Sequence, residues 1–376
     1  MRGVISLGAF RWIRTWASVC VSMYVWVATA PLMHAQTPSS ISAQTGSLAL
    51  LWPIKTREHI DLWLHGFALL QDDSSSAIPL FRRGYRDELT VLKNSTNVLT
   101  QLDLNVERLQ DGLHKSRMLA SAQFLPFYFS SLDEMRAAIQ QFVAGDGSPK
   151  EAPSRAESAA FEALRRYFQT PADRAWLALF SSGLWDEESK FYHSYWVHQQ
   201  RSRGKVIDSV QAMWQHTMLP RLQRFLNSTQ QHGADIMLCL PLDGEGRTLS
   251  GAGVERAVVG VTFPASPSDA AEAMYAIVHE IVGRMAHSAI RDNVTAAQVR
   301  SGDADRLESP VTVRAGLMLL QKKLPELADG YASYYIQATG RTPDAHPQAQ
   351  MEALFPLPDA MRASLAHQMD VIENGV

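Results

Sequence analysis

The sequence predicts an α+β fold that is mainly helical, with a small sheet packed on one long helix and a helical subdomain before it. Three observations support this class. Apolar residues recur at helical spacing through most of the chain, for example at Ile60, Trp63, Leu64 and Phe67. Between residues 234 and 263 the pattern changes to short apolar and β-branched runs, which predict strands. A helix start at Ser266-Pro267 follows these runs directly.

Composition narrows the class of function. The 376 residues contain 46% hydrophobic and 19% charged side chains, which is ordinary for a globular protein of one large or two modest domains. The net charge is −3, and the sequence contains no basic run and no glycine-rich phosphate loop. We therefore expect no nucleic acid and no nucleotide among the partners.

The N-terminus has the pattern of a targeting segment. Arginines precede an apolar stretch at 16–30, and Ala35 offers a small residue before a cleavage point. We predict a signal peptide at residues 1–35 and a secreted or periplasmic mature protein. The alternative is an uncleaved N-terminal membrane anchor, because residues 15–33 are long enough to span a bilayer with tilt. Contact with a membrane is expected only in that case.

Cysteine usage follows from this prediction. Cys20 lies inside the apolar stretch, so cleavage leaves Cys239 alone and no intramolecular disulfide is possible. Cys239 lies in an apolar run, which favours a buried thiol.

Two regions are predicted after the signal peptide. Residues 36–145 form an N-terminal helical region, which begins with a helix at 56–70 and ends with one at 132–143. The stretch 145–155 is polar and contains glycine and proline, which is typical of a boundary. Residues 156–376 form the second, α+β domain.

The second domain is expected to begin with aromatic-rich helices at 172–225, whose aromatic side chains pack in the core. Two adjacent strands are then predicted at 234–240 and 254–263. The long helix runs from the start at Ser266-Pro267 to about Ile290, and the chain from Val311 onward is again helical.

Two short segments carry the chemistry. The long helix contains His279-Glu280-Ile281-Val282-Gly283, and a later helix contains Asp329-Gly330-Tyr331-Ala332-Ser333-Tyr334. In an HExxH helix the two histidines share a face and bind zinc, and the glutamate acts as general base. A catalytic zinc needs three protein ligands and an open position for water. Gly283 occupies the second histidine position and has no ligand atom.

Together the two segments resemble the active site of zincin-like metallopeptidases of the gluzincin, aminopeptidase N type, in which they read HExxH and Glu-Gly-Phe-Ala-Ser-Tyr. The resemblance covers residues 234–340 and includes the strand at 254–263, which in gluzincins is an edge strand that pairs with substrate. It implies a motif helix packed under a small sheet, with zinc as the cofactor. It also implies His279 and Asp329 as metal ligands and Glu280 as the catalytic general base.

Each of these residues has a plainer interpretation. His279 is equally well explained as a hydrogen-bonded core histidine. Gly330, next to Asp329, is also explained by close packing of two helices, and Glu326 is an alternative carboxylate one turn earlier. His287 does not replace the missing ligand, because it lies about 12 Å further along the helix. The histidines that could complete a ligand set from elsewhere are His59, His65, His193 and His198.

Two functions follow from this reasoning. The first is an exported degenerate metallopeptidase homologue without ordinary peptidase turnover, which acts as a binding or scaffold protein, because loss of one ligand removes most zinc affinity. The second is an active zinc-dependent peptidase that uses His279, Asp329 and a non-standard third ligand, with Glu280 as general base. Both predict a peptide or protein as ligand. A third interpretation, an exported helical protein of no hydrolase ancestry, predicts that residues 254–263 do not form an edge strand beside the motif helix.

Overall fold

The computed structural model describes residues 51–71, 78–148, 155–251 and 256–374. The signal peptide predicted at 1–35 lies outside these residues. Within the described ranges, no helix has both the length and the apolar character needed to cross a bilayer.

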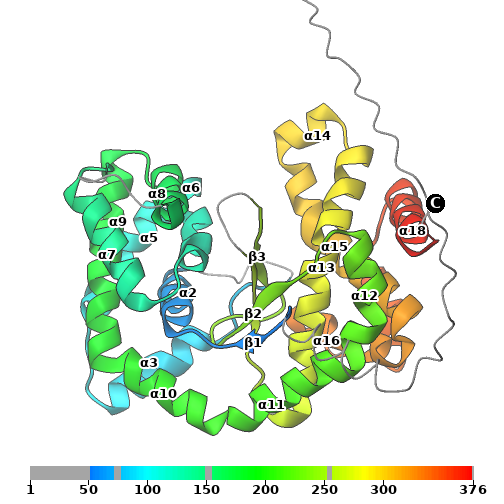
Figure 1. Ribbon diagram of the computed structural model, residues 1–376, viewed down its shortest axis with the longest axis horizontal. Helices are drawn as coiled ribbons and strands as arrows, with labels where there is room; N and C mark the ends of the chain where they lie inside the picture. The colour runs from blue at the N-terminus through cyan, green and yellow to red at the C-terminus, as the bar shows by residue number, and fades with distance from the viewer. Residues whose placement is uncertain (1–50, 72–77, 149–154, 252–255, 375–376) are drawn as a thin grey trace, which may run out of the picture.

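The fold is mainly helical with one small sheet, as predicted (Figure 1). The sheet has four strands in the order β1-β2-β4-β3. Three of them are parallel, and β3 runs antiparallel to β4 at one edge. The strands are β1 (Ile54–Lys55), β2 (Ala234–Cys239), β3 (Arg247–Leu249) and β4 (Ala257–Thr262).

An N-terminal lobe of helices lies on one side of the sheet (Figure 1). Its helices are α2 (Glu58–Leu70), α3 (Tyr85–Ser95), α4 (Gln101–Leu104), α5 (Val106–Lys115), α6 (Arg117–Ser121), the 3-10 helix η2 (Ala122–Tyr128), α7 (Leu132–Ala144), α8 (Arg155–Tyr167) and α9 (Pro171–Glu187). The core of this lobe includes residues on both sides of the predicted boundary at 145–155. Phe180 of α9 packs edge-on against Trp63 and Phe67 of α2, with ring centroids 5.0 Å and 5.2 Å apart. The break in sequence composition therefore does not coincide with a break in the packed core.

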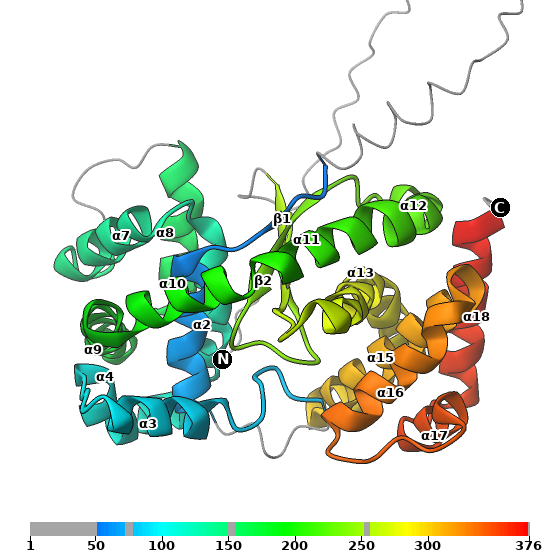
Figure 2. The same ribbon diagram turned by 90° about the horizontal axis from the view of Figure 1, so that it is seen from below.

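A run of helices crosses from this lobe to the other side of the sheet (Figure 2). It consists of the π-helical turn η3 (Glu188–Tyr192), α10 (His193–Ser202), α11 (Gly204–Met213), a second π-helical turn η4 (Trp214–Met218) and α12 (Leu219–Ser228). Trp214 is fully buried and packs against Trp52 beside β1, with ring centroids 5.5 Å apart. This contact supports the prediction that the aromatic side chains of 172–225 serve packing.

The C-terminal lobe is built around the motif helix α13 (Ala270–Asn293), which packs on β4 and α15 (Figure 1). Its other elements are the 3-10 turn η5 (Pro267–Asp269), α14 (Ala296–Ser301), α15 (Asp303–Lys323), the 3-10 turn η6 (Pro325–Leu327), α16 (Ala328–Ala338), α17 (Pro347–Leu354) and α18 (Asp359–Asn374). The predicted start at Ser266-Pro267 is confirmed, with a single 3-10 turn between it and the α-helix.

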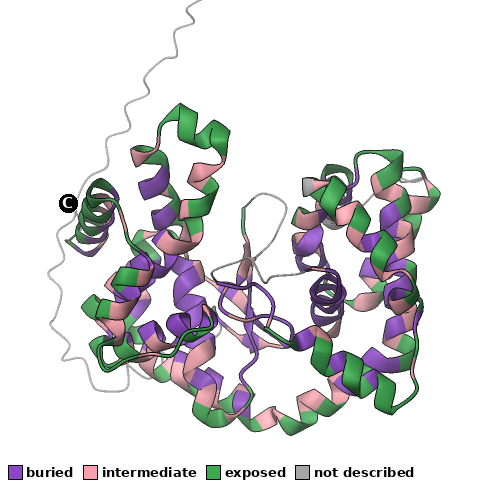
Figure 3. Ribbon diagram, turned by 180° about the vertical axis from the view of Figure 1, so that it is seen from behind, coloured by how far each residue is buried: buried purple, intermediate pink, exposed green. Residues whose placement is uncertain are grey.

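The sheet differs from the prediction in which strand forms its edge, because the strand at 254–263 was expected there. β2 and β4 are adjacent and parallel, but β4 lies inside the sheet and the short strand β3 forms the edge beside it. The buried strands β2 and β4 lie between the two lobes (Figure 3). Apolar side chains on both faces are typical of parallel strands covered on both sides, which explains why the sequence pattern revealed these two and not β3.

Candidate functional site

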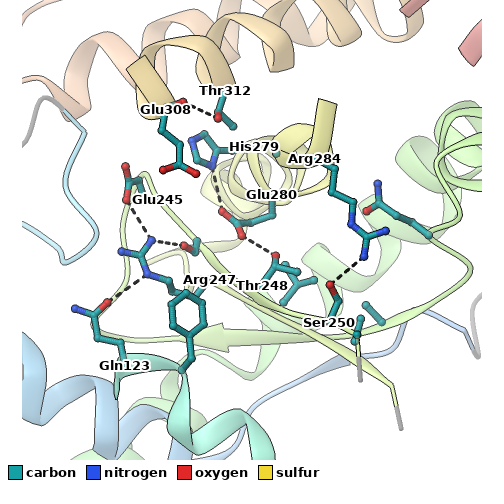
Figure 4. Close-up of a pocket in the computed structure, with 18 of the residues that line it drawn as sticks. Gln123, Glu245, Arg247, Thr248, Ser250, His279, Glu280, Arg284, Glu308 and Thr312 are labelled. Atoms are coloured by element: carbon teal, nitrogen blue, oxygen red, sulfur yellow. Dashed lines mark hydrogen bonds and ion pairs between the residues drawn. The ribbon is translucent and has the colours of Figure 1, made fainter. Parts of the chain in front are cut away.

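A pocket of about 830 Å³ opens between the two lobes, beside β3 and α13. The N-terminal lobe contributes Gln123 and Phe124 to its wall, and the sheet contributes Arg247 and Thr248. The C-terminal lobe contributes His279, Glu280 and Gly283 from α13 and Asp305, Glu308 and Thr312 from α15 (Figure 4). The pocket therefore contains the motif predicted from the sequence, together with side chains from segments far away in the chain.

The Glu280 carboxylate links α13 to the edge strand. Its Oε2 accepts a 2.6 Å hydrogen bond from the Thr248 hydroxyl, and its Oε1 lies 3.1 Å from His279 Nδ1 (Figure 4). Burial raises the pKa of Glu280, but the contacts with His279 and Thr248 and the charge of Arg247 outweigh it and hold this pKa below its usual value. Glu280 is therefore an ionised, hydrogen-bonded carboxylate.

Gly246 permits this close approach of strand and helix. A Cβ atom at position 246 would lie 2.6 Å from Cγ of Glu280 and 2.7 Å from the carbonyl oxygen of Gly260. Any side chain here would push β3 away from α13.

His279 is only 7% exposed and stacks on Tyr335 of α16, with ring centroids 5.8 Å apart. Its Nδ1 faces Glu280, whereas its Nε2 is buried and has no hydrogen-bond partner among the described residues. Figure 4 shows the imidazole and the Glu308 carboxylate pointing toward one another. His279 thus lies at the junction of α13, α15 and α16 with one ring nitrogen unused.

Gly283 lines the same pocket one turn after His279. A Cβ atom built at this position meets nothing within 4 Å, so the space for a side chain at the second ligand position is open. The helix therefore presents positions 279 and 283 to one cavity, as the spacing of an HExxH motif requires.

Asp329 is not brought to this pocket. It is exposed, and its Oδ1 accepts a 2.8 Å hydrogen bond from Gln348 Nε2 of α17. The tyrosines of α16 face α13 in its place: Tyr335 stacks on His279, and Tyr331 packs edge-on against Tyr275 at 5.8 Å. The structure thus brings His279 and Glu280 together and directs the Asp329 carboxylate elsewhere.

Gly330 explains why α16 is turned about its own axis so that its tyrosines, and not Asp329, face α13. A Cβ at position 330 would lie 2.1 Å from the Tyr275 hydroxyl, so glycine is required for the close contact of α16 with α13. Glu326, the alternative carboxylate, is also exposed and pairs with Arg221 at 3.2 Å.

The other candidate histidines lie away from the pocket wall. His59 Nε2 contacts the Phe129 carbonyl oxygen at 3.0 Å, and burial lowers the pKa of His59 to about 4. His65 is fully buried between Tyr85 and Glu187. The remaining candidates, His193 and His198, are exposed, as is His287, which the helix spacing had already excluded.

One cluster of possible ligands lies outside the pocket. Within the described ranges, the one group of three or more His, Cys, Asp or Glu side chains with ligand atoms within 4.8 Å of one another is Glu58, Glu188 and His193. His193 Nδ1 lies 2.8 Å from Glu58, and Glu188 pairs with Arg136 at 3.5 Å. Both carboxylates are thus engaged by side chains of the protein.

The residues at the motif do not fit a three-ligand zinc site. Of the implied ligands, His279 alone faces the pocket with a free nitrogen, because Gly283 has no ligand atom and Asp329 is bonded to Gln348. A catalytic zinc requires three protein ligands, and the implied set supplies only this one to the pocket.

Sequence reasoning did not identify Thr248, Arg247 or Glu308 as pocket residues. Thr248 and Arg247 lie in a three-residue strand among glycines, which has the composition of a loop. Glu308 lies before the region where the sequence predicts the last helices, and α15 begins earlier, at Asp303. The sequence did contain one signal for this wall: Asp305, Glu308 and Thr312 are three and four residues apart, which places them on one face of a helix.

Comparison with known proteins gave no match to this chain, whether to a family model, to a curated protein or to a solved structure.

Proposed function

We propose that this chain is an exported, zincin-like protein that binds an extended peptide or protein segment in the pocket beside β3, without ordinary peptidase turnover. The observation that carries this proposal is the position of Glu280. Both of its carboxylate oxygens are engaged, one by Thr248 of the edge strand and the other by His279. A general base must instead reach the water that attacks the substrate.

The edge strand supports a peptide as the ligand. One side of β3 pairs with β4, and no strand among the described residues pairs with its other side. Arg247 and Thr248 of β3 line the pocket. An extended peptide can add to such an edge through backbone hydrogen bonds, while neighbouring pockets select its side chains.

β4 is not the edge strand, which is what the interpretation without hydrolase ancestry predicted. The kinship with the zincin fold that we propose rests instead on β3. An antiparallel edge strand precedes the motif helix, and its central residue contacts the motif glutamate directly. The pocket also keeps an open position at Gly283. We infer that the chain descends from a zinc peptidase, has retained the peptide cleft and has lost the ligand set. Export rests on the N-terminal sequence pattern alone.

The test is a combined measurement of metal, binding and turnover on the mature protein. After incubation with zinc and desalting, we expect far less than about one equivalent of bound metal, because one histidine is a weak zinc site. A blocked pentapeptide, acetyl-Thr-Val-Lys-Val-Thr-amide, is expected to bind and to slow hydrogen exchange of amides 247–249. It should remain intact during the incubation.

Other results would decide against this function. Stoichiometric zinc with cleavage of the peptide would favour the active peptidase, for which the unused Nε2 atom of His279 is the supporting observation. If the peptide slowed amide exchange elsewhere and left the exchange at 247–249 unchanged, the ligand would bind outside the edge strand.

A further inference from the structure

The pocket wall formed by α13 and α15 contains a buried ring nitrogen, Nε2 of His279, with no hydrogen-bond partner among the described residues. The Thr248 hydroxyl donates to Oε2 of Glu280, and in the neutral imidazole the Nδ1–H of His279 donates to Oε1. In this tautomer Nε2 of His279 carries the lone pair and accepts a hydrogen bond. It is buried and has no partner among the described residues, which is costly unless a ligand supplies the donor.

Two carboxylates extend this wall of acceptors. Asp305 and Glu308 line the pocket one helical turn apart on α15, and no described residue forms a salt bridge with either. The Glu308 carboxylate points toward the His279 imidazole (Figure 4). A single group that donates hydrogen bonds and carries a positive charge would satisfy both side chains.

The cationic side chains of the pocket already have other contacts. Arg247 pairs with Glu245 at 3.2 Å, and Arg284 donates to the Ser250 hydroxyl at 3.0 Å. Figure 4 places Arg284 on the side of Glu280 away from Glu308. The described part of the protein therefore leaves the acceptors of His279 and Glu308 without a cation.

We propose that this wall receives a basic side chain, a lysine ammonium or an arginine guanidinium, from the extended peptide bound along β3. The inference rests on the proposed function and specifies its ligand class. Thr248, which holds Glu280 and through it His279, is the middle residue of β3. A peptide paired with β3 would extend beyond Thr248 at both ends. A side chain from the middle of the peptide, and not its amino or carboxyl terminus, would therefore reach His279 and Glu308.

The test compares blocked pentapeptides, acetyl-Thr-Val-Xaa-Val-Thr-amide, in which Xaa is lysine, arginine, norleucine or glutamate. Binding is measured by calorimetry with the mature protein. We expect lysine or arginine to bind about tenfold more tightly than norleucine, and glutamate to bind worst. In Glu308→Gln the preference over norleucine should fall to about twofold, because the charged acceptor is gone. Glu308 is exposed, so this variant is expected to fold.

Glu107→Gln is the matched control. It removes the same charge from an exposed position on α5 in the other lobe and should keep the full preference. Equal binding of all four peptides would overturn the basic-side-chain inference and leave the peptide cleft standing. Binding of none would overturn both. Zinc chloride alone binding to the parent protein, but not to Glu308→Gln, would show that the acceptors hold a metal ion instead.

Discussion

The Thr248 hydroxyl donates a 2.6 Å hydrogen bond to Glu280, and this contact joins the edge strand β3 to the motif helix α13. The carboxylate that would act as general base in a zinc peptidase here holds two elements together. Glu280 therefore contributes to the shape of the pocket, and its removal should affect structure and binding together.

Thr248→Val tests this link, because valine keeps the shape of threonine and lacks the hydroxyl. The Glu280 carboxylate then loses one of its two partners, and we expect the free energy of unfolding to fall by about 1–3 kcal/mol. The pKa of Glu280 should rise, since a hydrogen bond that lowers it is lost. Denaturant unfolding measures the first effect. Thr248→Ser retains the hydroxyl and should remain near wild type; equal losses in both variants would contradict the role of the hydrogen bond.

Gly283→His tests whether the open position is a vestigial ligand site. The new imidazole would share a helix face with His279 and enter space where a Cβ meets nothing within 4 Å. With Glu308 beside His279, we expect the variant to gain about one equivalent of zinc, measured by metal analysis after desalting.

Gly283→Ala is the control for this variant. It should bind no more zinc than the parent protein and should raise stability by about 0.5–1 kcal/mol, because glycine inside a helix is unfavourable. A histidine variant that folds and yet gains no zinc would argue that positions 279 and 283 never formed a metal site.

The part of the pocket wall that could be predicted from the sequence is the motif helix with His279, Glu280 and Gly283. The capping pattern at Ser266-Pro267 predicted the start of the motif helix, and the apolar runs predicted β2 and β4 as adjacent strands. Local patterns suffice for these elements because helix starts and buried strands depend on neighbouring residues.

The direction of Asp329 could not be predicted in this way. The resemblance of the two short segments to a zincin site predicted that α16 lies next to α13, and the tyrosines of α16 do contact that helix. The rotation of α16, however, depends on Gly330 meeting Tyr275 and on Tyr335 donating to the Gly244 carbonyl oxygen at 3.0 Å. Such contacts join residues far apart in the chain, so helical periodicity does not reveal them.

Substitution of Asp329 should therefore change stability little, whereas substitution of Gly330 should lower it. Asp329→Asn changes an exposed side chain that contacts Gln348, and we expect a stability change within about 0.5 kcal/mol. Gly330→Ala places a methyl group against the Tyr275 hydroxyl and should destabilise the protein by about 1–3 kcal/mol. Thermal unfolding of both variants measures the difference. Greater damage from the aspartate substitution would mean that the hydrogen bond from Gln348 to its carboxylate stabilises the C-terminal lobe more than the close contact at Gly330 does.

The N-terminal lobe contains a buried charged cluster that should control its stability. Glu187 is fully buried, and Lys93 pairs with it at 2.8 Å and with Asp103 at 2.6 Å. Lys93→Met leaves the Glu187 charge without its main cation, and we expect a loss of about 3–5 kcal/mol. The double variant Lys93→Met/Glu187→Gln should recover part of this loss, because no uncompensated charge remains. Denaturant unfolding of the two variants provides the comparison, and a double variant no more stable than the single one would count against charge as the cause.

Asp61 should make stability depend on pH near neutrality. It is fully buried, and its carboxylate accepts hydrogen bonds from the Leu240 amide at 2.8 Å and from Trp196 Nε1 at 2.9 Å. Burial nevertheless raises the pKa of Asp61 from 3.8 to about 7. Between these values the folded protein retains a proton that the unfolded chain has lost, so the contribution of Asp61 to stability falls as pH rises and is constant above about pH 7.

Asp61→Asn isolates this effect, because the amide does not titrate. Between pH 4 and pH 8 the unfolding free energy of the wild type should fall by up to about 4 kcal/mol relative to that of the variant. His59 works in the opposite direction, since its pKa is lowered to about 4 and its contribution grows from pH 4 to 6.5. It is common to both proteins and cancels in the difference. Urea unfolding at several pH values measures the shift, and a difference that stays constant across the range would show that Asp61 is ionised in the folded protein throughout.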